Sequence, residues 1–134
     1  MVYSERDKQA AMALLGTAVK KVTWPEGYSR TPQDIWDRLS PRWQEGQMEL
    51  DENLVNATVA SWNECAWVIT AADAADHDQS VANPRSQFYA TAHALEGSSS
   101  TEFADQMFDK LELGDTGDAR SFILGNECDA VFKK

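Results

Sequence analysis

Few residues in this chain of 134 could support chemistry, and its two cysteines are the first to consider. Cys65 lies in the segment WNECAW (62–67), between two tryptophans, and Cys128 lies 63 positions later. Neither cysteine has a C-x-x-C pattern or a neighbouring histidine, so we expect no zinc site. A reactive thiol needs a nearby base or a helix N-terminus to lower its pKa, and Cys65 falls in the middle of a predicted helix. A catalytic thiol is therefore disfavoured.

Two interpretations of the cysteines remain. A disulfide between Cys65 and Cys128 would tie the C-terminal segment to the long helix, and the chain-entropy model gives it a stabilisation of about 4 kcal/mol. The alternative is a pair of unbonded, buried cysteines. We favour the disulfide. Because disulfides persist in oxidising compartments, this choice favours an extracytoplasmic location over a cytoplasmic one.

An acidic cluster, Asp73, Asp76, His77 and Asp78, is the best candidate for metal binding. On a helix, Asp73 and His77 are i,i+4 neighbours that could bind one ion together. The commoner alternative is a solvated, acidic helix end that leads into a loop. We adopt the latter interpretation and predict no metal site.

The sequence contains none of the usual enzyme signatures. G-x-S-x-G, H-E-x-x-H and phosphate-binding glycine loops are all missing, and the two histidines, His77 and His93, lie on different predicted helices. We therefore predict no catalytic residue, no cofactor and no enzymatic activity.

Charge is distributed unevenly along the chain, whose formal net charge is −10. Residues 1–43 contain seven basic and five acidic residues, whereas 44–134 contain five basic and seventeen acidic ones. Between Gln44 and Asp109 the only basic residue is Arg85. Such a charge repels phosphates, so we expect no direct nucleic-acid binding; a basic protein surface, a cation or simple solubility remain as explanations. No segment approaches the roughly 20 apolar residues that a membrane span needs.

Apolar residues recur at helical spacing along most of the chain, so helices must position these residues. We expect helices over 4–22, 32–39, 51–75, 83–96, 99–113 and 119–124, a second short segment over 41–50, and a tail over 126–134. Thr31-Pro32 and Ser40-Pro41 each look like a helix start, and Ser99 with Glu102 forms a capping box. The prediction is an all-α fold: one compact domain over 1–134, a bundle of about five or six helices of which one is long and central.

The central helix is predicted to bury a broad face. At about 100° per residue around the helix axis, five apolar residues point within about 60° of one direction: Val55, Val59, Trp62, Ala66 and Ile69. Cys65 lies on the flank of that face. Trp67 points about 140° away from Trp62. Either the helix is covered on two sides or Trp67 is partly exposed, and we favour the covered alternative.

Aromatic residues gather in the less acidic part of the chain, at Trp24, Tyr28, Trp36 and Trp43. Aromatics in loops often belong to interaction surfaces, because they offer a large contact area at low entropic cost. The alternative is that they close the end of the bundle. We favour closure for Trp36 and Trp43, which occupy helical positions, and leave both alternatives open for Trp24 and Tyr28.

WPEGYSRTPQD (24–34) followed by ECAW (64–67) resembles a pattern in small, uncharacterised, helical, membrane-anchored or secreted proteins of actinobacteria. The two motifs span about a third of the chain. The resemblance implies an extracytoplasmic domain that is normally preceded by an anchor, with its N-terminal helix closest to the membrane. It implies no activity.

These observations lead to two functional hypotheses. The first is a non-enzymatic, extracytoplasmic binding or structural module whose protein partner is unknown, a basic protein being one alternative. Its candidate partner-binding residues are Trp24, Tyr28, Asp73, Asp76 and Asp78. The second is an acidic inhibitor, such as an immunity or anti-defence protein, that occupies a basic nucleic-acid-binding surface.

Overall fold

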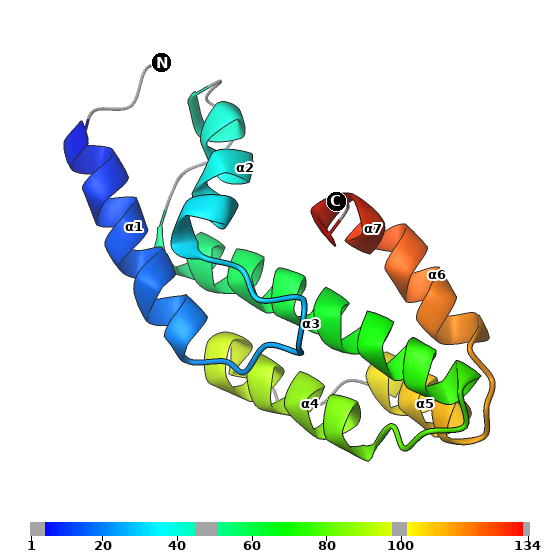
Figure 1. Cartoon of the computed structure of the whole chain (residues 1–134). Helices are drawn as coiled ribbons and strands as arrows, with labels where there is room; N and C mark the ends of the chain where they lie inside the picture. Colours follow the sequence, from blue (N-terminus) through cyan, green and yellow to red (C-terminus); the bar gives the residue numbers. More distant parts are fainter. Residues whose placement is uncertain (1–4, 45–50, 98–101, 133–134) are drawn as a thin grey trace.

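A long helix, α3 (Glu52–Asp76), lies at the centre of the structure, a computed structural model that describes residues 5–44, 51–97 and 102–132 (Figure 1). The other helices are α1 (Glu5–Lys20), α2 (Pro32–Gln44), α4 (Ala82–Glu96), α5 (Glu102–Glu112), α6 (Gly117–Gly125) and α7 (Cys128–Phe132). These described residues contain no strand. The predicted all-α bundle with a long central helix is confirmed.

Helix α3 begins where the sequence predicts. The Asp51 carboxylate accepts a hydrogen bond of 2.8 Å from the Leu54 amide and so caps the first turn. The helix packs against α1, α4, α5, α6 and α7. Because it is covered on several sides, its own apolar residues are distributed around its whole circumference. Trp62 and Trp67 point in different directions, yet only 8% and 4% of their surfaces are exposed. The covered alternative for Trp67 is therefore confirmed.

The apolar core has separate parts along α3. Helices α1 and α2 lie at one end, where Leu15, Ile35 and Trp36 are buried (Figure 1). Helices α4, α5 and α6 meet at the other end, where the Phe88 and Phe108 rings pack edge to face with centroids 5.3 Å apart. A smaller cluster between them contains Cys65, Cys128 and Phe132.

Helix α2 differs from the prediction, because it continues through Pro41 to Gln44 and does not restart at Ser40-Pro41. Proline removes one helical hydrogen bond. Pro41 is exposed, however, whereas Ile35, Trp36 and Leu39 are buried on the opposite side. Burial of those three side chains sustains the helix across the lost bond.

The C-terminal segment also differs, because residues 128–132 form helix α7 and not an irregular tail. The sulfur atoms of Cys65 and Cys128 lie at disulfide distance, with Cα atoms 5.3 Å apart, as the favoured pairing predicts. Phe132 is buried beside them, and its ring packs edge to face against Tyr28 and Trp62. These contacts explain why so short a helix is ordered.

The remaining helix ends lie within about two residues of the predicted bounds where the structure describes them. Gly97 adopts a left-handed conformation, with φ of 70°, and caps α4. The Asp115 carboxylate accepts a hydrogen bond from the Gly117 amide at the start of α6. Ser99, and with it the predicted capping box, lies outside the described residues, as does the side chain of Trp43. None of the described helices has the length and hydropathy needed to cross a membrane.

Candidate functional site

The loop between α1 and α2 contains Trp24 and Tyr28, two of the predicted partner-binding residues. Tyr28 is half-buried, and the edge of its ring faces Phe132 with centroids 5.3 Å apart. The Arg30 guanidinium covers the same Phe132 ring at 4.6 Å. Trp24 is also half-buried, and its enclosed indole nitrogen has no hydrogen-bond partner among the residues that the structure describes. The structure thus places both aromatics over the core beside α7.

A hydrogen-bonded network anchors this loop to α3. The Thr23 carbonyl accepts bonds of 2.9 Å from the Asn63 amide group and from the Trp67 indole N–H. The Asn63 side-chain oxygen accepts a further bond from the hydroxyl of Thr91 on α4. Asn63 is completely buried, so the network satisfies polar groups that would otherwise be costly to enclose.

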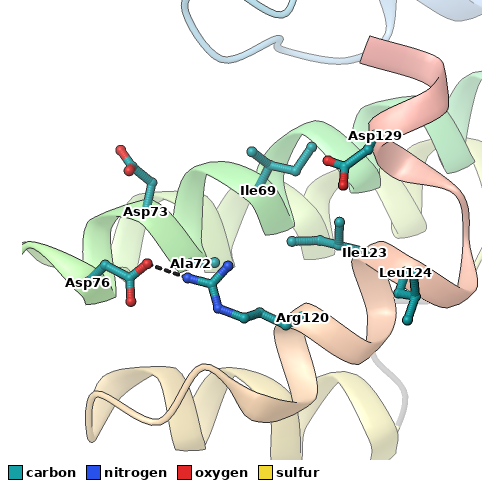
Figure 2. Close-up of a pocket in the computed structure, with 8 residues that line it drawn as sticks. All are labelled: Ile69, Ala72, Asp73, Asp76, Arg120, Ile123, Leu124 and Asp129. Carbon is teal, nitrogen blue, oxygen red and sulfur yellow. Dashed lines mark hydrogen bonds and ion pairs between the residues drawn. The ribbon is translucent and has the colours of Figure 1, made fainter. Parts of the chain in front are cut away.

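Asp73 and Asp76, two of the predicted acidic residues, line a groove of about 300 Å³ between α3, α6 and α7. We call it the α3–α6–α7 groove. Ile69 and Ala72 also come from α3, Arg120, Ile123 and Leu124 come from α6, and Asp129 comes from α7 (Figure 2). Asp78, the third predicted carboxylate, is exposed in the loop after α3 and is not part of the lining.

Two local features position the walls of the groove. Helix α6 is held against the bundle by Ala119, which is fully buried, and by the ion pair of Lys110 with Asp118 at 3.1 Å. Helix α7 is held by Cys128, so Asp129 follows a residue that is fixed next to Cys65. Ile69 lies one turn after Cys65 on α3, which brings it to the same end of the groove.

The groove contains three carboxylates and one guanidinium. Arg120 reaches across from α6 and forms an ion pair with Asp76, which Figure 2 shows as a dashed line. Asp73 lies 3.5 Å from the Nδ1 atom of His77. Among the described residues, no salt bridge involves Asp129. The lining therefore has an excess of negative charge.

His77 lies beside the groove and responds to its charge. The Asp73 backbone carbonyl, 2.8 Å from Nδ1, raises the pKa of the imidazole, and the negative charges of Asp73 and Asp76 raise it further. A protonated His77 would partly neutralise Asp73. Because His77 is exposed, solvent weakens this interaction.

A second titratable group, which the sequence reasoning did not single out, lies inside the WNECAW segment. Glu64 is half-buried on α3 and shares a hydrogen bond with Glu96 of α4. Burial, this hydrogen bond and repulsion by Glu96 together raise the pKa of Glu64 to about 9. Folding therefore keeps this carboxyl group protonated at neutral pH.

Another groove, of about 550 Å³, lies over the first half of α3. Its lining includes Leu39 and Arg38 of α2, Trp62 of α3, and Glu127. The single Arg38 and the single Glu127 give it no excess charge of either sign. It offers less chemical specificity than the α3–α6–α7 groove.

The side chains of the α3–α6–α7 groove suit binding. The described part of the chain has no group of three or more histidine, cysteine, aspartate or glutamate side chains arranged to hold a metal ion. What the groove offers is an apolar floor with carboxylates around it, an arrangement that accepts a basic and partly apolar group.

Comparisons with protein-family models, with curated proteins and with solved structures found no match to this chain. Any functional conclusion therefore rests on the chain's own residues.

Proposed function

We propose that this chain is a non-enzymatic, extracytoplasmic binding module whose protein partner docks in the α3–α6–α7 groove. The observation that carries the proposal is the groove itself, an open hollow of about 300 Å³ with apolar side chains from two helices. Leu124, on its edge, has 81% of its surface exposed. A concave surface lined by apolar side chains with a few charged groups is typical of a binding site.

The proposed location rests on the cysteines. Cys65 and Cys128 are both buried and lie at disulfide distance, and a disulfide that staples two helices is typical of proteins from oxidising compartments. The disulfide also supports the proposed site, because it fixes the helix that contributes Asp129.

Site-specific photocrosslinking in the cells that make the protein tests the proposed surface. A benzoylphenylalanine in place of Leu124 should give one discrete crosslinked protein, because this position borders the groove. Leu113 provides a matched control, since it is an equally exposed leucine, at 87%, that does not line the groove. Equal adducts from both positions, or none from Leu124, would contradict the proposal.

The acidic inhibitor is the second candidate function. It is favoured by one observation: Arg85, the only basic residue in 44–109, is itself bonded to Asp109 at 2.9 Å and to Glu112 at 3.1 Å. The surface of this segment therefore has no free cation to offset its carboxylates. In this case, replacing Asp73, Asp76 and Asp78 by asparagine should abolish partner binding. Binding that survives with ordinary salt dependence would contradict the inhibitor.

A further inference from the structure

The α3–α6–α7 groove already holds one guanidinium. Arg120 extends over the groove, its Nε donates to Thr116 at 3.3 Å, and its terminal nitrogen donates to Asp76 (Figure 2). The lining thus already pairs one guanidinium with one of its carboxylates.

The same groove has further carboxylates that Arg120 does not neutralise. Asp129 is exposed on α7 and has no ion pair among the described residues, while the carboxylate of Asp73 lies beside the exposed His77. Between these carboxylates lie the partly buried side chains of Ile69 and Ile123. The groove therefore offers a second place for a cationic head with an apolar stem.

We infer that the groove recognises an arginine side chain of the protein partner. The guanidinium binds Asp129, Asp73 adds negative charge to the same hollow, and the methylene stem lies on Ile69 and Ile123. A planar guanidinium is preferred to a lysine ammonium, because it is more weakly hydrated and pairs with carboxylates through two hydrogen bonds. This inference rests on the proposed function, and it adds the chemistry of the bound group.

The inference predicts an unusual role for Arg120. Because Arg120 neutralises Asp76, it competes electrostatically with an incoming arginine. Replacing it by glutamine leaves α6 anchored by Ala119 and by the ion pair of Lys110 with Asp118. Arg120→Gln should therefore strengthen arginine binding, whereas loss of a groove carboxylate should weaken it.

Titration of the ¹⁵N-labelled protein with N-acetyl-arginine N-methylamide tests these expectations by NMR. We expect weak binding, with amide shifts at Ile69, Ile123 and Asp129, and no comparable shifts with the neutral citrulline analogue. Asp129→Asn should weaken affinity about threefold, the Asp73→Asn/Asp129→Asn pair should weaken it about tenfold, and Arg120→Gln should strengthen it about twofold. Asp37→Asn is the matched control on α2 and should leave affinity unchanged.

A second measurement does not depend on any variant. Raising sodium chloride from about 0.05 M to about 0.5 M should weaken arginine binding severalfold, because salt screens exposed ion pairs. Equal shifts with citrulline, an effect of Asp37→Asn as large as that of Asp129→Asn, or weaker binding in Arg120→Gln would each overturn the inference. A Leu124-specific crosslink together with any of these results would leave the binding module standing without its arginine specificity.

Discussion

Thr23 is a small residue in an exposed loop, yet its carbonyl joins two parts of the molecule. It accepts hydrogen bonds from Asn63 and Trp67, which lie four residues apart and therefore on the same side of α3. Helical spacing alone places these two side chains on one face. The same spacing does not reveal their common acceptor, which lies 40 residues from Asn63 in the sequence.

Glu64 makes the stability of the fold depend on pH. Its pKa rises from 4.5 to about 9 on folding, so between these values the folded chain holds a proton that the unfolded chain has released. The free energy of unfolding consequently falls as pH increases through this range. Glu64→Gln cannot ionise but can still hydrogen-bond, so it should remove this contribution.

We expect Glu64→Gln to match the wild-type free energy of unfolding at pH 4 and to exceed it at pH 8, by a margin that grows by at most about 1.4 kcal/mol per pH unit. Denaturant titrations across this range measure the difference. Glu52→Gln, at an exposed position on the same helix, is the control and should follow the wild-type pH dependence. Parallel curves for Glu64→Gln and wild type would show that Glu64 ionises normally in the folded state.

At the scale of elements, α7 depends on contacts distant in sequence. Five residues are too few to form a stable helix alone, since isolated helices shorter than about 12 residues are marginal in water. The Cys65–Cys128 link and the burial of Phe132 supply the missing stabilisation. The pairing of the two cysteines could be predicted from the sequence. The helix α7 could not, because five residues are too few to show a helical repeat of apolar residues.

Replacing both Cys65 and Cys128 by alanine should lower the free energy of unfolding by about 4 kcal/mol, because the link closes a long loop. Amide hydrogen exchange should accelerate most in α7 and in the adjoining end of α6. In α4 it should accelerate only as much as the lower global stability requires. Reduced wild-type protein is the matched comparison and should behave in the same way. Unchanged stability in both samples would indicate that packing alone holds α7.

At the scale of the whole molecule, the oxidation state of the cysteines separates the two locations. Protein isolated from its native compartment under rapid acid quench should resist thiol alkylation and should gain two alkyl groups only after reduction and unfolding. Intact-mass measurement reads this directly, and alkylation under denaturing conditions without reductant is the control for buried thiols. Two alkylated cysteines in that control would exclude the disulfide and remove the main support for an extracytoplasmic location.

The helix content and the central helix could be predicted because local signals specify them. Asp51 caps the start of α3, apolar residues recur at helical spacing, and glycines follow the ends of α4 and α5. The continuation of α2 through Pro41 could not be predicted in this way, because local rules assign a helix start to Ser-Pro. Tertiary burial of Ile35, Trp36 and Leu39 outweighs that local signal.

The sequence by itself determined the all-α class, the excess of negative charge and the candidate pairing of the two cysteines, since each depends on composition or on short-range periodicity. Only the tertiary structure decided which carboxylates share a surface. Asp73 and Asp76 line a groove with Asp129, more than fifty residues away, while the neighbouring Asp78 does not. The tertiary structure also separates the residues of WNECAW into three roles. Trp62 lies in the core, Cys65 lies against Cys128, and Asn63 and Trp67 hold the loop at Thr23. Such groupings depend on how helices distant in sequence pack together, which no local pattern contains.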